Sequence, residues 1–87
     1  MKDPYSILKH PISTEKAVRL IDKENKILFA VARHATKIDI KKAFEQVFSV
    51  KVSKVNTHHT PEGTKRAYIT LPKQHPAMDI ASKLGMI

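Results

Sequence analysis

The serine, histidine and arginine residues of this sequence have side chains that could take part in catalysis. The sequence around them argues against this role. Ser13, Ser49 and Ser53 are possible nucleophiles, but none lies in a Gly-x-Ser-x-Gly elbow. The chain has two glycines and no cysteine, which excludes a phosphate-binding P-loop, a dinucleotide fingerprint, thiol catalysis and Cys-ligated zinc. We therefore expect no enzyme and no bound cofactor.

His58 and His59 invite interpretation as a metal site. Adjacent residues at a strand end point to opposite sides of a sheet, and Glu62 is the only carboxylate close to them in sequence. No coordination set follows, so we predict no metal. We interpret the two histidines as surface residues that are able to touch phosphate.

Positive charge is the strongest chemical feature of the chain. Sixteen Lys and Arg against eight Asp and Glu give a net charge of +8 and a pI near 9.9. Such an excess suits a polyanionic partner, although a merely soluble basic protein is the alternative on charge alone. Because thirteen of the sixteen cations are lysines, contact with phosphate is favoured over reading of bases.

The side chains expected to bind RNA are cations and hydrogen-bond donors near the ends of consecutive elements, an arrangement that suits an irregular phosphate surface. They are Arg33, His34, Lys37, Lys41, Lys42, Asn56, Thr57, His58, His59, Thr60, Lys65 and Arg66. For Lys37 and Lys41 alone, a solvated helix face is an equal alternative. Tyr68 could stack on a base or pack across strands, and the aromatic signature of an RRM is missing.

The first half of the chain predicts a helical turn, a helix and a strand. Tyr5–Leu8 forms the turn, and either Ser13 or Thr14 caps the helix that follows. Asn25 lies just past the end of this helix, where a left-handed residue is common. Ile27–Ala32 is apolar on both faces, which indicates an interior strand.

The second half predicts a helix over 36–48, with Thr36 and Asp39 in the positions of a capping box. Val50–Thr57 alternates as a strand, with a bulge expected at Ser53–Lys54 because the period of two is broken there. The remaining elements are a turn at Pro61–Gly63, a strand over Lys65–Leu71 and a helix over Pro76–Leu84.

These elements predict one α+β domain over residues 1–87, with helices on one or both faces of a small, mainly antiparallel sheet. No apolar run approaches the roughly 18 residues of a membrane span, and no signal peptide is visible. We expect a soluble, intracellular protein without a small-molecule substrate.

From Pro11 to Leu84 the sequence resembles the L-twenty-three family of large-subunit ribosomal proteins. The motifs are Pro11-x-x-Thr-Glu-Lys16, Asn25-Lys26, Ala35-Thr-Lys37, Ile40-Lys41-x-Ala43, Phe48-x-Val50-x-Val52, Val55-Asn-Thr57 and Lys65-Arg-Ala-Tyr-Ile-Thr-Leu71. Each motif is weak alone, but their order and spacing are specific. The short loop over His58–Thr64 resembles a compact archaeal form, because bacterial members carry a long hairpin there.

The resemblance implies a four-stranded antiparallel sheet in which the segment near Ile7–Ile12 is an edge strand. It also implies binding to large-subunit rRNA beside the exit of the polypeptide tunnel, next to other ribosomal proteins. By motif, RNA contact is implied for Lys16, Lys26, Lys37, Lys41, Asn56, Thr57, Lys65 and Arg66.

The family also provides a docking platform for the signal recognition particle and other tunnel-exit factors. The resemblance makes Glu15 the acidic docking residue. A purely structural explanation exists, because a carboxylate in a first helical turn is favoured by the helix dipole and Arg19 is four residues away.

Two other functions are compatible with the elements alone. A small acylphosphatase-like enzyme would need an Arg and an Asn to converge on one phosphate, and Arg33 and Asn56 are the candidates. A free-standing regulator that binds RNA or DNA would differ from a ribosomal protein in occurring off the ribosome.

Overall fold

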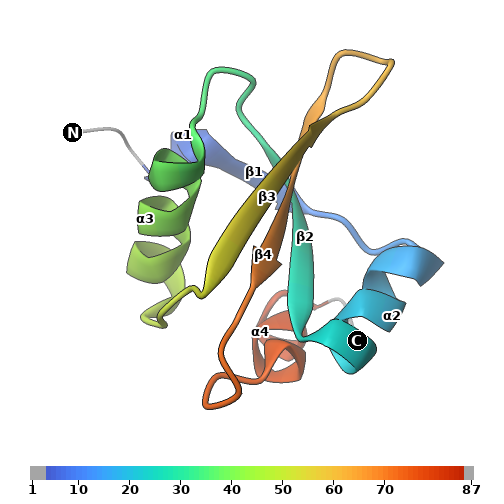
Figure 1. Ribbon diagram of the computed structural model, residues 1–87, viewed down its shortest axis with the longest axis vertical. Coiled ribbons are helices and arrows are strands. Elements are labelled where there is room, and N and C mark those ends of the chain that lie inside the picture. Colours follow the sequence, from blue (N-terminus) through green and yellow to red (C-terminus); the bar gives the residue numbers. More distant parts are fainter. Residues whose placement is uncertain (1–3, 86–87) are drawn as a thin grey trace.

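The computed structural model describes residues 4–85 as a four-stranded antiparallel sheet with helices packed against it (Figure 1). The strands are β1 (Leu8–Pro11), β2 (Lys26–Val31), β3 (Lys54–His59) and β4 (Lys65–Thr70), in the order β1-β2-β4-β3. The helices are α1 (Pro4–Ile7), α2 (Glu15–Glu24), α3 (Lys37–Phe48) and α4 (Ala77–Lys83). This architecture confirms the α+β class, the interior position of β2 and the edge strand implied by the family resemblance.

The core lies between the sheet and α3. Ile27 and Phe29 of β2 are paired with Ile69 and Ala67 of β4, and all four are buried. Phe44 of α3 packs edge-on against Phe29, with 6.0 Å between the ring centroids and 85° between the ring planes. This is a favourable aromatic geometry. The apolar side of α3 thereby fixes which face of the sheet points inward.

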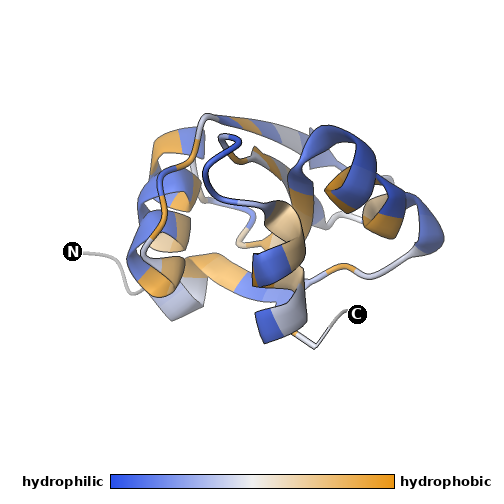
Figure 2. Ribbon diagram, turned by 90° about the horizontal axis from the view of Figure 1, so that it is seen from below, coloured by the Kyte–Doolittle hydropathy of each residue, from blue (hydrophilic) through white to orange (hydrophobic). Residues whose placement is uncertain are grey.

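Helix α2 lies on the opposite side of the sheet from α3 (Figure 1). It contacts β2, where Leu28 is buried although its cross-strand neighbour Tyr68 is only half-buried. Figure 2 shows hydrophilic stretches on the outer side of the helices and hydrophobic segments between them. The helices therefore cover one face of the sheet and only part of the other.

The expected helix caps are present. Thr14, not Ser13, caps α2 by accepting a hydrogen bond of 3.2 Å from the Ala17 N–H. At α3 the Thr36 hydroxyl accepts from the Asp39 N–H, and the Asp39 carboxylate accepts from the Thr36 N–H, both at 3.2 Å. This is a complete capping box, which satisfies two otherwise unpaired donors.

The predicted strand over Val50–Thr57 is wrong at its start. Residues 50–53 lie outside the regular strand, which begins at Lys54. The Ser53 N–H nevertheless donates to the Thr70 carbonyl at 2.9 Å, and Thr70 is also the partner of Lys54, so two residues face one residue of β4 where the bulge was predicted. The strand starts late because of a tertiary contact. The Val52 N–H donates to the Glu45 carboxylate of α3 at 2.9 Å, and the Val52 side chain is buried. A register shift is also present in β1, between Leu8 and His10.

Asn25 links three parts of the fold. It adopts the predicted left-handed conformation, with φ of 54°, and ends α2. Its side-chain amide donates to the carbonyls of Leu71 at 2.8 Å and Pro72 at 3.1 Å, and its oxygen accepts from the Ala77 N–H at 2.6 Å. One side chain thus holds α2, the end of β4 and the start of α4 together.

We predict that Asn25→Ala lowers the free energy of unfolding by about 2–3 kcal/mol, because it loses these bonds and places a less tolerant residue in the left-handed region. Ser49→Ala is the matched control. Ser49 has φ of 55°, and its side chain makes no hydrogen bond within residues 4–85, so we expect a change within about 0.5 kcal/mol. Denaturant titration measures both; equal losses would contradict the linking role of the Asn25 side chain.

Candidate nucleic-acid interface

The face of the sheet that α2 covers only in part collects polar side chains from β3 and β4. Residues directly paired across antiparallel strands point to the same side of a sheet. The pairs Lys54–Thr70, Asn56–Tyr68 and His58–Arg66 therefore share the side away from α3. We call these six residues the open face. Asn56, His58 and Arg66, predicted separately from the sequence, are brought together here.

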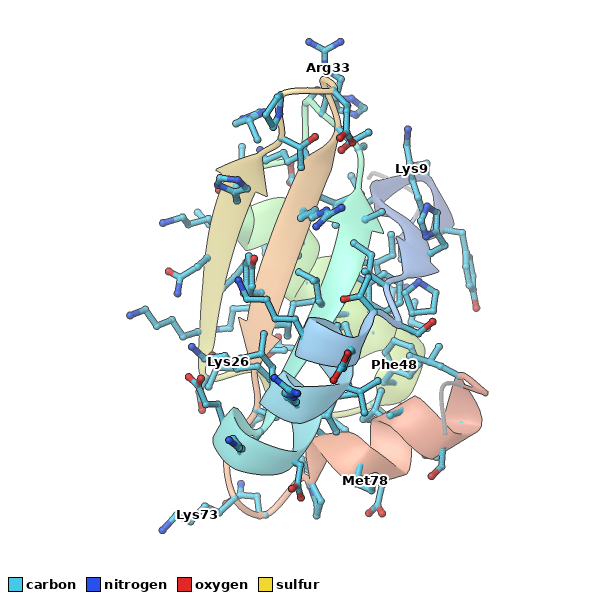
Figure 3. The ribbon with its side chains drawn as sticks, turned by 90° about the vertical axis from the view of Figure 1, so that its right-hand side faces the viewer. Lys9, Lys26, Arg33, Phe48, Lys73 and Met78 are labelled. Atoms are coloured by element: carbon cyan, nitrogen blue, oxygen red, sulfur yellow. The ribbon has the colours of Figure 1, made fainter. Side chains whose placement is uncertain are left out.

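A second group of predicted residues lies at one end of the molecule, which we call the tip: the β2–α3 connection, residues 32–36, and the hairpin loop, residues 60–64. Val31 and His59 are both paired with Lys65, so the two connections leave the sheet at the same end. Arg33 is exposed there, and Figure 3 shows it at the extremity. Thr60 closes the hairpin loop by donating its N–H to the Thr64 carbonyl at 2.9 Å.

Lys65 and Thr57 do not join the open face. Both are paired with residues that point toward α3, and both are half-buried. The Lys65 ammonium donates to the carbonyl of Ala35, which ties the two connections of the tip together. The structure therefore gives Lys65 a positioning role at the tip.

Lys37 and Lys41 are exposed on α3, one turn apart, and Lys37 belongs to the first turn next to the tip. A cation in a first turn is opposed by the helix dipole. The position of Lys37 is thus unfavourable for the helix itself, and an external anion would remove that disadvantage. This favours contact over a merely solvated face.

Lys16, Lys26 and Glu15 lie apart from the tip. Lys26, at the other end of β2 from the tip, is half-buried and forms an ion pair of 3.1 Å with Glu24. Lys16 is exposed in the first turn of α2. Beside it, the Glu15 carboxylate is 83% exposed and accepts a bond of 2.8 Å from Arg19. Since this pair is solvated, it contributes little to stability and leaves the carboxylate accessible.

Lys54 is the cation of the open face that the sequence prediction missed. It points to the same side as Asn56 and His58 because all three alternate along β3. The period of two could have identified it, but the expected bulge at Ser53–Lys54 interrupted that period. Lys54 adds an exposed cation to the open face.

Residues 4–85 contain no group of three or more His, Cys, Asp or Glu side chains placed to hold a metal ion. His58 and His59 pair with Arg66 and Lys65 and point to opposite sides of the sheet, as predicted. Arg33 lies in a turn beyond β2, whereas Asn56 lies within β3 opposite Tyr68. Within the described chain, no helix is both long and apolar enough for a membrane crossing.

Comparisons with known proteins agree with the resemblance noted above. The family model described as Ribosomal protein L23 matches residues 6–78. "Large ribosomal subunit protein uL23" of Methanothermobacter thermautotrophicus is 52% identical over 84 residues, which cover 97% of this chain and 98% of that protein. The protein of the same name from Methanococcus vannielii is 45% identical with the same coverage. The chain therefore belongs to the Ribosomal protein L23 family, as a structural protein of the cytoplasmic ribosome and not an enzyme.

Proposed function

We propose that this protein binds large-subunit rRNA near the exit of the polypeptide tunnel, and that residues 1–87 act as one rRNA-binding domain. The observation that carries the proposal is the position of the cations. Lys54 and Arg66 lie on the open face, Arg33 at the tip, and Lys37, Lys41 and Lys42 on the exposed side of α3, while most large apolar side chains are buried. Binding then rests on phosphate neutralisation and shape, without catalysis.

The proposed RNA contacts fall into two groups by strength of support. Those on the open face, the tip and α3 are supported by shared location: Arg33, Lys37, Lys41, Asn56, His58, Thr60 and Arg66. Thr57 and Lys65 point toward α3. Lys26 is paired with Thr70 of the open face but is held by Glu24, and Lys16 lies on α2. For these four the support is the family motif, together with the residual exposure of each side chain.

We propose further that Glu15 contributes to a docking surface for the signal recognition particle and other tunnel-exit factors, beside neighbouring ribosomal proteins. Glu15 begins α2, on the other side of the sheet from Lys37 and Lys41. Its carboxylate is exposed and held only by a solvated pair with Arg19. An acidic side chain on a very basic protein is suited to a cationic partner and unsuited to RNA.

We predict that Lys37→Glu with Lys41→Glu lowers the affinity of the isolated protein for rRNA about tenfold and makes its salt dependence shallower. Incorporation into the large subunit should fall accordingly in a sedimentation profile. Folding should be retained, since a carboxylate is favourable in a first helical turn.

The control for this double variant is Lys73→Glu with Lys83→Glu, which makes the same change in net charge. Lys73 precedes α4 and Lys83 ends it, and both are exposed. We expect near-normal incorporation of the control. Normal incorporation of the α3 variant would refute its assigned contact with rRNA.

We predict that Glu15→Lys leaves assembly of the large subunit intact but weakens binding of the signal recognition particle to the ribosome, because the exposed negative charge is reversed. Asp22→Lys is the control, since Asp22 is an exposed carboxylate on the same helix. Co-sedimentation of the particle with ribosomes carrying each variant is the measurement. Equal binding to Glu15→Lys and wild-type ribosomes would remove Glu15 from the docking surface.

A further inference from the structure

A hollow of about 380 Å³ lies between the end of β1, the middle of the sheet and the hairpin loop. Its floor is Ala30 of β2. Ala30 is paired with His10 of β1 on one side and with Arg66 of β4 on the other, and its side chain is the smallest of the three. Pro11 and Ile12 line one wall, and the loop residues line the wall opposite. The volume lies within the range of small-ligand sites.

Hydrogen bonds hold both walls of the hollow in place. On one side the Ile12 N–H donates to the Leu28 carbonyl at 2.9 Å and continues the pairing of β1 with β2. On the other side the Thr60 and Thr64 hydroxyls lie 2.6 Å apart, and the Gly63 N–H donates to the Thr60 carbonyl at 3.0 Å. The hollow is therefore largely preformed, which lowers the entropic cost of binding.

The lining combines three kinds of chemistry. Arg66 supplies a half-buried guanidinium, and within residues 4–85 no carboxylate lies within ion-pair distance of it. Ser13 and Glu62 supply a hydroxyl and a carboxylate at the rim, both exposed. Pro11 and Ile12 supply apolar surface. An RNA nucleotide matches this set, with its phosphate, its 2′-hydroxyl and the apolar faces of its base.

We propose that the hollow receives one unstacked nucleotide of an RNA strand, with its phosphate on Arg66 and its base against Pro11 and Ile12. A paired helix cannot present a base in this way, because its bases are stacked. The proposal rests on the proposed binding to rRNA and adds that this contact selects a single-stranded or bulged segment. The cation of Arg66, with the imidazole of His58 beside it as a further hydrogen-bonding group, favours RNA over a peptide side chain as the occupant.

The test is an NMR titration of the full chain with a single-stranded RNA, a fully paired RNA duplex of equal length and inorganic phosphate, at equal ionic strength. We expect amide shifts at Ala30, Thr64 and Arg66 with the single strand, and much smaller shifts with the duplex. Equal shifts with the duplex, or the same shifts with phosphate alone, would overturn the proposal in favour of a general anion site.

Two variants separate the contribution of the space above Ala30 from that of the Arg66 charge. Ala30→Leu fills the hollow without a change in charge, and we expect single-strand affinity to fall about tenfold with an unchanged salt slope. Arg66→Gln should weaken binding and reduce the magnitude of the salt slope by about one. Lys73→Gln, at the end of the molecule opposite Arg33 (Figure 3), removes the same charge and should have little effect. Thermal unfolding checks that each variant folds. If Ala30→Leu does not fold, Arg66→Gln is decisive when it is titrated with both RNAs, because the hollow requires a larger loss of affinity for the single strand than for the duplex.

The outcomes distinguish this proposal from the general function. If Lys37→Glu with Lys41→Glu loses RNA while Ala30→Leu and Arg66→Gln retain it, the hollow is not a nucleotide site but the protein still binds rRNA. If the wild-type chain binds no RNA, both proposals fail. A photoreactive residue in place of Ser13 in assembled large subunits should cross-link to RNA; a cross-link to a neighbouring protein would identify a peptide occupant and overturn the nucleotide assignment.

Discussion

The register of β4 between β2 and β3 is the constraint on which the other features depend. It places Ala67 and Ile69 against α3 and, through the alternation of strand residues, sends Arg66 and Tyr68 to the other side. A slip of one residue would exchange the two sets, burying a guanidinium and exposing the core. Because Phe29 and Phe44 require apolar partners on one side of the sheet, the register also fixes Arg66 on the other side. Stability and the binding surface are therefore specified together.

Local chemistry made much of the fold predictable. The capping box at Thr36 and the left-handed Asn25 follow from short-range rules, and both are present. The irregular segment over residues 50–53 was not predictable, because Val52 is held by Glu45 from a different element. Partial cover of the sheet by α2 is likewise a tertiary result, since the helix pattern shows an apolar side but not which strand it meets.

The sequence predicted which residues belong to the candidate site better than it predicted how they are arranged in space. Residue types and the position of a polar run beside the hairpin loop selected Asn56, His58 and Arg66, and β3 and β4 bring them to one face. Lys65 belongs by the same alternation to the apolar side, but its bond to the Ala35 carbonyl depends on the meeting of two connections. The hollow above Ala30 is formed by residues 10–13, by β2 and by the hairpin loop with Arg66. No local sequence motif could therefore predict it.

The edge position of β3 has a consequence for the protein away from its partners. Within the described residues no strand lies on the outer side of β3, so its free backbone groups could pair with another copy of the chain. Lys54 at the start of this strand and the high net charge oppose such pairing by repulsion. Salt screens that repulsion. Newly made protein should thus be most prone to self-association where ionic strength is high and nucleic acid is scarce.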